Sequence, residues 1–426
     1  MTLCDYIKRV IRYGPKGIVL WTRIKWGEYK ARRFFMRNAR RFDLTPVRGV
    51  TLIGSFTGHD SISKVMRDFL FAVHDAGIPY QTFSTGGDGN PVQMGVADLL
   101  TPIEEFRIKK YSLVVEMFNG FVPDDLMLDI ANVAFWEFED GFLPVYPQFT
   151  HKKHVIGMSD FVVETLRREL PRSTEVSKLL YPFRCSIGDI KPKVDIRKRF
   201  KIKQDAFVVF FNFDFASGFN RKNPEGAIRA FAKAFKDTKD AFLVFKTMRS
   251  NGFPERVACL EQLAVELGVR DRFIMIHEYL SDVDIYSLTN ACDVYLSLHR
   301  GEGFGLGVAE AMLLGLSVVV SDYSATTEFC NPSNAILVPC KIVPPRQNQR
   351  DHLTYSYVTK WADPDISFAA NALIRLYNNP SMRAHIGLYA REYIREYFSL
   401  GRFKESLEKL LHDNFHNEIV RHFVWK

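Results

Sequence analysis

The chain has 426 residues, of which 47% are hydrophobic and 25% are charged, and its formal net charge is +8. This length exceeds the size at which one hydrophobic core stops growing, so we expect two domains. No apolar run approaches the roughly 18 residues that span a bilayer, and the N-terminal residues lack the apolar core of a secretion signal. Six widely spaced cysteines without metal-ligand spacing indicate a reducing compartment, so we expect a cytoplasmic protein.

The positive charge is concentrated in the first 50 residues. They contain thirteen Lys and Arg against three Asp and Glu, a net charge of +10, so the rest of the chain is close to neutral. Apolar residues such as Trp21, Trp26 and Phe34 lie between these charges, as in helices that lie at a membrane surface. A solvated helix packed on its own domain is the alternative, and nucleic acid is a less favoured partner. We therefore predict that residues 1–45 form a basic helical extension that binds an anionic membrane, and that the protein is peripheral on the inner face of the cell membrane.

Short apolar runs alternate with helical patterns along the rest of the chain. Residues 49–56 predict a buried strand, and an amphipathic helix follows over about 61–76. Further alternation is interrupted at residues 181–205, a polar stretch with two prolines and no periodicity that is typical of a linker. Short apolar strands between helices predict parallel sheets covered on both faces, and here two such sheets in succession.

The second half has the clearer pattern. We expect strands at 206–214, 241–247, 272–280, 293–299 and 317–322, and helices at 224–235, 256–267 and 282–290.

A glycine-rich stretch in this half, "SLHRGEGFGLGVAEAMLLGLSVVVSD" at 297–322, carries two glutamates. Parallel sheets bind ligands beyond the carboxyl ends of their strands, so Glu302 is expected in the loop at that edge and Glu310 on the first turns of a helix that begins near Gly305. Free amides at the start of a helix favour a phosphate, whereas carboxylates favour the hydroxyl groups of a sugar or ribose. The combination predicts a ligand with both phosphates and hydroxyl groups, such as a nucleotide sugar.

Three segments carry a resemblance to a known family. "LHRGEGFGLGVAEAMLLGLSVVVSDYSATTEF" resembles the signature of the retaining, family 4-like glycosyltransferases called group 1, in which seven residues separate two glutamates. "FDFASGFNRKNPEGAIRAFAKAF" is similar to the donor-phosphate segment of that group, and "GVTLIGSFTGHDSISKVMRDFLFAVHDAGIP" to the opening of its acceptor domain. The resemblance covers roughly 48–400 and is weakest between 85 and 180.

The resemblance implies an α/β fold of the GT-B type, with two Rossmann-like domains facing across a cleft. The expected parts are the basic extension 1–45, an acceptor domain 46–190, a nucleotide-sugar domain 191–390, and C-terminal helices 391–426 that pack back on the N-terminal domain.

The resemblance also implies roles for individual residues. Glu302 corresponds to the glutamate near the donor sugar, and Glu310 to the one that holds the ribose hydroxyls. Arg221 or Lys222, together with Lys246, match the basic positions that neutralise the departing diphosphate. The segment "FNFDFAS" lacks a further arginine or glycine found in many relatives, which weakens the expected upstream phosphate contact. The residues expected in catalysis are thus Glu302, Arg221, Lys222 and Lys246.

The remaining candidates are expected to line the donor and acceptor sites. The donor contacts are Gly303, Phe304, Gly305, Leu306, Tyr279, Leu280 and His299. The acceptor or cleft contacts are Thr57, Gly58, His59, Trp136 and Glu137. A packing role is the alternative for the histidines, for Trp136 and for Glu137.

The expected chemistry is the transfer of a hexosyl group from a UDP- or GDP-linked sugar to a saccharide or lipid-linked saccharide, in cell-surface polysaccharide synthesis. Preorganised cations can stabilise a departing diphosphate without a metal, and no DxD pair stands at a strand end, so we expect neither a metal nor a cofactor. Retention, by attack on the face that the phosphate leaves, is implied by the resemblance. A sugar-nucleotide epimerase or hydrolase is the alternative enzyme, and a non-catalytic saccharide-binding or scaffold protein is a third possibility.

The basic extension can be tested by truncation. Each Lys or Arg close to an anionic bilayer contributes about 1 kcal/mol, so a few engaged residues suffice to hold the protein there. A chain that begins at Arg48 should stay folded and bind nucleotide but no longer sediment with anionic vesicles, and high salt should release the full-length protein from them. An insoluble truncated chain, with a full-length protein that ignores vesicles, would show that the extension is a packed part of the fold.

Overall fold

The structure is a computed structural model that describes residues 49–56, 58, 61–84, 96–101, 113–117, 131–134, 140–141, 149, 154–184, 190–346, 349 and 357–414. The basic extension lies outside the described residues, and so do four of the predicted acceptor residues, Thr57, His59, Trp136 and Glu137. The predictions for these residues stay predictions. None of the described helices is both long and apolar enough to cross a bilayer.

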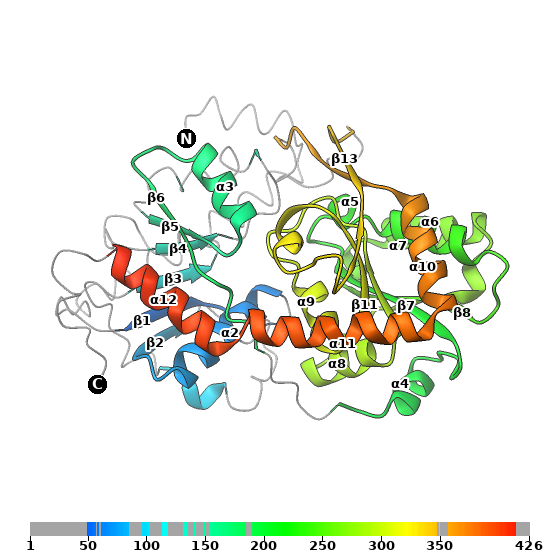
Figure 1. Cartoon of the computed structure of the whole chain (residues 1–426), viewed down its shortest axis with the longest axis horizontal. Helices are drawn as coiled ribbons and strands as arrows, with labels where there is room; N and C mark the ends of the chain where they lie inside the picture. Colours follow the sequence, from blue (N-terminus) through cyan, green and yellow to red (C-terminus); the bar gives the residue numbers. More distant parts are fainter. Residues whose placement is uncertain are drawn as a thin grey trace.

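The N-terminal domain is built on a parallel sheet, seen on the left of Figure 1. Over the described residues its order is β2-β1-β3-β4-β5-β6, and all neighbours run parallel. Helix α2 packs on β1, and α3 packs on β5 and β6. The elements are β1 (Val50–Gly54), α2 (Ser61–Asp75), β2 (Tyr80–Ser84), the 3-10 turn η2 (Ala97–Leu99), β3 (Leu113–Met117), β4 (Ala131–Ala134), β5 (His154–Gly157), α3 (Asp160–Glu169) and β6 (Glu175–Lys178).

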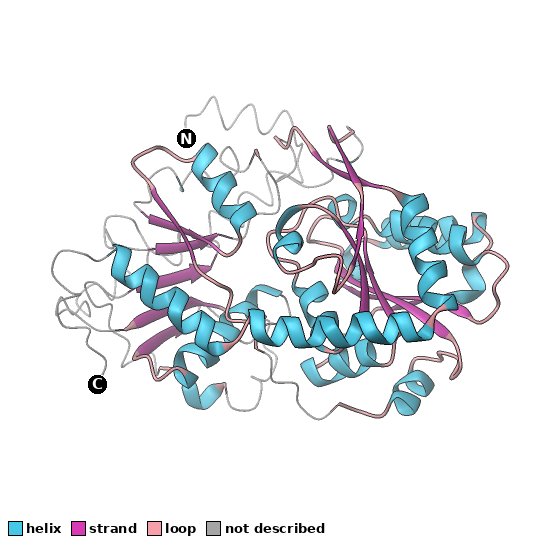
Figure 2. Ribbon diagram, viewed as in Figure 1, coloured by secondary structure: helices cyan, strands magenta, loops and turns pink. Residues whose placement is uncertain are grey.

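The C-terminal domain is built on a second parallel sheet, whose described strands have the order β12-β11-β10-β7-β8-β9. Figure 2 shows helices around this sheet. Its first elements are α4 (Lys193–Arg199), β7 (Phe207–Asp214), α5 (Phe219–Lys222), α6 (Pro224–Phe235), β8 (Ala241–Met248), η4 (Ser250–Gly252), α7 (Pro254–Glu266), η5 (Arg270–Arg272), β9 (Phe273–Ile276) and α8 (Asp282–Asn290). The later ones are β10 (Val294–Ser297), α9 (Leu306–Leu313), β11 (Ser317–Ser321), η6 (Ser324–Glu328), β12 (Ile336–Val338), the antiparallel pair β13 (Cys340–Val343) and β14 (Trp361–Pro364), α10 (Ile366–Asn378), α11 (Pro380–Tyr397) and α12 (Leu400–Asn414).

The predicted pair of parallel sheets is confirmed, with shorter strands at two places. Strand β9 ends at Ile276, where its pairing with β8 ends at Lys246, so residues 277–280 of the predicted strand form a loop. Strand β10 likewise ends at Ser297, before the predicted end at residue 299. After β10 the buried residues Leu298 and His299 continue past the last ladder pair, and a sequence pattern follows burial rather than pairing. After β9 the next three residues are exposed, and burial resumes only at Leu280.

The predicted linker 181–205 has no helical period in the sequence, yet part of it forms helix α4. Arg197 on this helix is buried and donates hydrogen bonds to the Ala291 carbonyl at 2.9 Å and to the Asp293 carboxylate at 3.0 Å. A buried arginine does not contribute to the periodic pattern of apolar residues by which a helix is predicted from sequence. The helix is therefore held by a buried ionic contact that hydropathy does not reveal.

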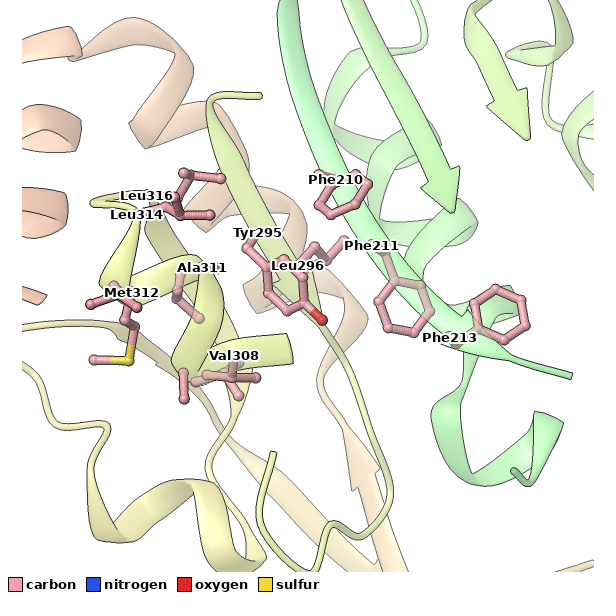
Figure 3. Close-up of a cluster of buried hydrophobic side chains, with 14 of the residues drawn as sticks. Phe210, Phe211, Phe213, Tyr295, Leu296, Val308, Ala311, Met312, Leu314 and Leu316 are labelled. Carbon is pink, nitrogen blue, oxygen red and sulfur yellow. The ribbon is translucent and has the colours of Figure 1, made fainter. Parts of the chain in front are cut away.

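The core beneath the glycine-rich segment is made of aromatic and aliphatic side chains. Figure 3 shows side chains of α9, among them Val308 and Met312, on one side of Tyr295 and the β7 phenylalanines on the other. The Tyr295 and Phe210 rings lie 6.0 Å apart, and all these side chains are buried. The packing fixes α9 against the centre of the sheet, which fixes the position of Glu310 on the same helix.

An aromatic cluster joins the two domains. It contains residues from α2, from the segment after β6, from the glycine-rich loop and from the C-terminal helices: Phe69, Tyr181, Phe183, Phe304, Phe329, Phe398 and Phe403. The ring centroids of Tyr181 and Phe304 are 4.4 Å apart, and those of Phe69 and Phe403 are 6.0 Å apart. Helix α11 runs along the C-terminal domain, and α12 lies on the N-terminal one (Figure 1). The chain therefore returns to the N-terminal domain after residue 398.

The close packing of α11 gives a stability test. A Cβ at Gly387 would lie 2.0 Å from the Gly315 carbonyl oxygen, so Gly387→Ala must displace the helix. We expect a loss of about 1–3 kcal/mol, as for overpacked cores, visible as a lower melting temperature. Gly401 on α12 is the matched control, because a Cβ there meets nothing within 4 Å. Gly401→Ala should leave the melting temperature unchanged or raise it, and a Gly387→Ala protein as stable as the control would contradict this packing.

Candidate active site

The loop between β10 and α9 places the first glutamate at the carboxyl edge of the sheet. Helix α9 begins after Gly305, whose φ of +94° is a left-handed conformation, and a Cβ there would lie 2.4 Å from Thr326 Cγ2. Only glycine suits both requirements. The Glu302 N–H donates to Ser324 Oγ at 2.9 Å, which ties the loop to η6. The turn of the loop and the start of the helix are therefore fixed by the sequence at Gly305.

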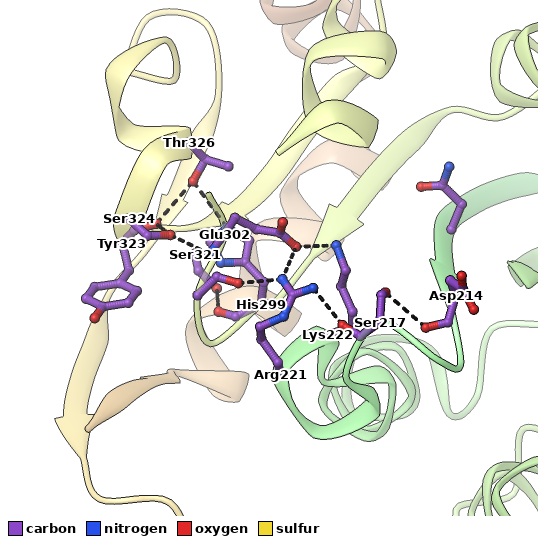
Figure 4. A network of polar contacts seen from close by, with 12 residues as sticks. Asp214, Ser217, Arg221, Lys222, His299, Glu302, Ser321, Tyr323, Ser324 and Thr326 are labelled. Atoms are coloured by element: carbon purple, nitrogen blue, oxygen red, sulfur yellow. Dashed lines mark hydrogen bonds and ion pairs between the residues drawn. The ribbon is translucent and has the colours of Figure 1, made fainter. Parts of the chain in front are cut away.

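The Glu302 carboxylate is held by two cations from helix α5. Its Oε1 accepts a hydrogen bond from Lys222 Nζ, and Arg221 Nη1 lies 3.1 Å from the same oxygen. Figure 4 shows the three side chains converging between α5 and the glycine-rich loop. Burial alone would raise the pKa of Glu302, but Lys222 and Arg221 outweigh it and lower the value to about 2. Glu302 is thus ionised at any physiological pH and does not act as a proton donor.

The two adjacent cations have different positions. Arg221 is only 1% exposed, and its guanidinium donates to the Gly301 carbonyl at 2.8 Å and to the Ser217 carbonyl at 2.7 Å. The Lys222 side chain is 21% exposed. The resemblance implied a phosphate contact by Arg221 or by Lys222. In this structure Arg221 fixes the loop, and Lys222 is the more exposed of the two.

Lys246 lies near the end of β8, beside the β7 strand. Burial lowers its pKa to about 8, although Asp214, Glu278 and Glu310 oppose this by favouring the charged form. Arg249, the residue after the end of β8, contacts the Asp214 carboxylate at 2.7 Å and was not among the predicted residues. A buried lysine that titrates close to neutral pH is suited to binding a phosphate anion, because the anion restores its charge.

Glu310 lies on α9, and its contacts come from both domains. Its Oε1 accepts a hydrogen bond from the Tyr286 hydroxyl at 3.4 Å and lies 3.8 Å from Lys64 Nζ of the N-terminal domain. Burial raises the pKa of Glu310 to about 7, and Lys64 opposes that rise. The predictions missed Lys64 and Tyr286, since neither lies within a motif. For Lys64, the one signal in the sequence was a positive charge on the buried face of an amphipathic helix.

Three predicted donor contacts have buried side chains. His299 is 0% exposed, and its Nε2 donates to Thr326 Oγ1 at 3.2 Å, because the Thr326 proton is used on the Tyr323 carbonyl. Burial lowers the pKa of His299 to about 4, so the ring is neutral. Phe304 belongs to the aromatic cluster, and Leu280 is part of the core. In this structure His299 and Phe304 pack against the rest of the loop, and Leu280 packs in the core. The donor contacts expected of these three residues stay predictions.

The other predicted donor and acceptor residues that the structure describes are Tyr279, Leu306, Gly303 and Gly58. Tyr279 is 58% exposed, and Leu306 at the start of α9 is partly exposed. The Gly303 carbonyl accepts a hydrogen bond from Ser159 Oγ at 2.8 Å, and the Gly58 carbonyl accepts one from Arg67 Nη1 at 2.7 Å. The Ser159 bond joins the N-terminal domain directly to the glycine-rich loop.

A further contact at the domain boundary involves Glu328 at the end of η6. Its carboxylate accepts a hydrogen bond from the Asp160 N–H at the start of α3, and it lies 2.8 Å from Lys178 Nζ. A carboxylate is favoured at the start of a helix by the free N–H groups and the helix dipole. This ion pair joins β6 to η6, and the Ser159 bond joins the start of α3 to the glycine-rich loop, so both cross the boundary between the domains. Within the described residues, no group of three or more His, Cys, Asp or Glu could hold a metal ion.

Comparisons with known proteins agree with this arrangement. Residues 193–343 match the family model described as glycosyl transferases group 1. No curated protein sequence matches the chain. Among solved structures, a glycosyltransferase from Rickettsia africae is 12% identical, with a TM-score of 0.61 over 87% of this chain and 100% of that one. HepE from Anabaena, in complex with UDP and glucose, is 14% identical, with a TM-score of 0.61 over 86% of this chain and 100% of its own.

A third similar structure is sucrose-phosphate synthase from Thermosynechococcus elongatus, which is 16% identical, with a TM-score of 0.59 over 87% of this chain and 99% of that one. At these identities the similarity shows the fold alone, and that fold is the α/β GT-B type, as predicted. The family model matches only the C-terminal part of the chain, over residues 193–343.

The lowered pKa of Lys246 gives a test by pH. If Lys246 binds the diphosphate in its protonated form, the affinity for UDP should fall about five- to tenfold as the pH rises from 7.5 to 9, through the pKa of about 8. Lys246→Arg keeps its charge in this range, so its affinity should change little. Calorimetric titration at several pH values measures both. A wild-type affinity that is constant over this range, or a Lys246→Arg protein that shows the same fall, would argue against phosphate binding by Lys246.

Proposed function

We propose that this chain is a retaining, metal-independent glycosyltransferase that moves a hexosyl group from a UDP- or GDP-linked sugar to a saccharide acceptor. The observation that carries the proposal is the joining of Glu302 to Arg221 and Lys222 at the carboxyl edge of the sheet. This places Lys222, whose side chain is 21% exposed, beside a helix start that favours anions. The group 1 family match and the GT-B fold support transfer from a nucleotide sugar.

In the proposed reaction the bond between the anomeric carbon and the diphosphate oxygen breaks, and its electron pair stays on the diphosphate. Lys222 and Lys246 stabilise this charge, together with the backbone N–H groups at the start of α9. The acceptor hydroxyl attacks the anomeric carbon from the same face, and a phosphate oxygen of the leaving group takes its proton. This course suits Glu302, because an ionised carboxylate that is engaged by two cations is a weak nucleophile.

Glu302 and Glu310 have separate roles in this scheme. Glu302 fixes Lys222 and the loop beside the donor sugar, whereas Glu310 accepts hydrogen bonds from the ribose hydroxyls. The structural neighbour HepE was solved with UDP and glucose, which supports a UDP-linked hexose as one donor to test. Residues Tyr279 and Leu306, both with exposed surface, are suited to the remainder of the nucleotide.

We further propose a lipid-linked saccharide acceptor in cell-surface polysaccharide synthesis, with the protein bound peripherally to the inner face of the membrane. The support is the charge of +10 and the interleaved aromatic residues in the first 50 positions. Binding there would bring the site close to acceptors in the same membrane and raise their effective concentration.

Product analysis tests the proposal. The protein is incubated with UDP-, GDP- and ADP-sugars, with and without a lipid-linked saccharide, and the products are identified by mass spectrometry and the anomeric configuration by NMR. Transfer to the acceptor with retained configuration is expected. Free sugar without transfer would indicate a hydrolase, and an altered sugar nucleotide an epimerase, while inversion of the anomeric centre would overturn the retaining course.

Two variants separate the roles of the glutamates. Glu310→Ala removes charge-assisted hydrogen bonds to ribose, each worth roughly 1.5–3 kcal/mol, so the dissociation constant of the nucleotide should rise at least tenfold. Glu302→Ala should mainly lower turnover, because Lys222 loses its partner while the ribose contact stays. Calorimetry and initial rates measure the two effects. If both variants kept the wild-type affinity and rate, the two glutamates would have only structural roles and the site would lie elsewhere.

A further inference from the structure

Lys64 brings a positive charge from the N-terminal domain to the carboxylate of Glu310. It lies on α2, and its Nζ is 3.8 Å from Glu310 Oε1. The same Nζ lies 3.1 Å and 3.3 Å from the two Asp68 carboxylate oxygens, one helical turn further on. Both ends of the interaction are largely screened from solvent, since the Lys64 and Glu310 side chains are 12% and 11% exposed. A charge contact with so little exposure is weakly screened and strong for its distance.

Neighbouring groups hold Lys64 in this position. The Asp68 carboxylate also accepts a hydrogen bond from the Tyr181 hydroxyl, so it is fixed from a second element. The Lys64 ammonium lies 5.9 Å from the ring centroids of Phe183 and Tyr286, which are favourable cation–π positions. Burial lowers the pKa of Lys64, but Asp68 and the other nearby acidic groups outweigh it and raise the value above its ordinary range. Lys64 therefore stays charged wherever the protein is folded.

The charged and titratable groups that act on Glu310 come from five parts of the structure. They are Lys64 and Asp68 on α2, Asp282 and Tyr286 on α8, Lys246 on β8, Tyr295 on β10, and Tyr181 after β6. Asp68 is engaged by Lys64, and Asp282 lies 3.7 Å from Arg67. Among these groups Lys64 has the strongest effect in favour of the ionised Glu310.

We propose that Lys64 is a positioning residue for Glu310, which it keeps charged and oriented to accept the ribose hydroxyls of the donor, so that the N-terminal domain sets the nucleotide affinity. This inference rests on the proposed function. Both Lys64 and Tyr286 reach Oε1 of Glu310, which leaves Oε2 for a ligand hydroxyl. The nucleotide site is then completed only when α2 lies against α8 and α9.

The consequence appears in the dependence of affinity on pH. A protonated carboxyl group donates one hydrogen bond and no longer accepts two from a ribose. Burial already raises the pKa of Glu310 to about 7 with Lys64 present. Removal of the Lys64 charge would raise the pKa of Glu310 further, because Lys64 is the group that most strongly counteracts the effect of burial. Nucleotide affinity should therefore fall as the pH drops through the pKa of Glu310, and this fall should begin at a higher pH without Lys64.

The experiment is a calorimetric titration of the full chain with UDP and with GDP between pH 6 and pH 9. It compares the wild type, Lys64→Met, Lys64→Arg and Lys239→Met, an exposed lysine that serves as the control for the same substitution. At pH 7 the Lys64→Met protein should bind the nucleotide about five- to tenfold more weakly than the wild type, and at pH 9 within about twofold of it. Lys64→Arg should have the pH profile of the wild type, and so should Lys239→Met. The loss of protons by Lys246 at high pH affects all four proteins alike and cancels in the ratio.

Three results would overturn the inference. A weakening by the same factor at every pH would show that Lys64 acts through packing alone. An unchanged affinity would show no role, and a tighter binding by Lys64→Met would show that Lys64 competes with the nucleotide. If Lys64→Met does not fold, the Lys64→Arg protein provides the test. Lys64→Arg keeps the positive charge, so a fall in nucleotide affinity that begins at a different pH from the wild type would contradict a role of that charge. A wild-type protein that binds neither UDP nor GDP would instead remove the proposed function, and the inference with it.

Discussion

The buried contact of Glu302 with Arg221 and Lys222 is the interaction on which the rest of the site depends. It joins the segments that follow two strands of the same sheet, β7 and β10, at their carboxyl ends. A buried charge that loses its partner is strongly destabilising, so none of the three side chains can move alone. Arg221 also binds the Gly301 carbonyl, which fixes the turn before Gly305 and hence the start of α9. The position of Lys222 at the surface and that of Glu310 on α9 both follow from this one contact.

The site is also shared between the two domains. The aromatic cluster, the Ser159 bond to Gly303 and the Lys64 contact with Glu310 all cross the boundary beside the same loop. The contacts between aromatic rings are apolar and only weakly directional, whereas the polar contacts depend on the distance between the two groups. A small rotation of the domains would therefore keep the ring contacts and break the polar ones. This gives a physical reason for ligand affinity to respond to the relative position of the domains.

Much of the C-terminal domain could be predicted from the sequence. Its strands are continuous apolar runs, and the glycines of its loop indicate a tight turn before a helix. The two glutamates were placed because strand ends of a parallel sheet meet at one edge, whereas Lys246 was implied by the family resemblance. What could not be predicted depends on contacts between distant residues. Helix α4 is held by the buried Arg197, the His299 ring turns inward to Thr326, and Lys64 meets Glu310 across 246 positions of sequence. Hydropathy records none of these, since each concerns a polar group satisfied inside the fold.

The central claim is that cations of the protein bind the diphosphate of a nucleotide without a metal ion. Calorimetric titration with UDP and GDP in the presence of EDTA, repeated with added Mg²⁺ or Mn²⁺, tests it most directly. The account predicts that one of the two nucleotides binds in EDTA, with an affinity that added metal does not increase. Binding that appears only after Mg²⁺ or Mn²⁺ is added would contradict it.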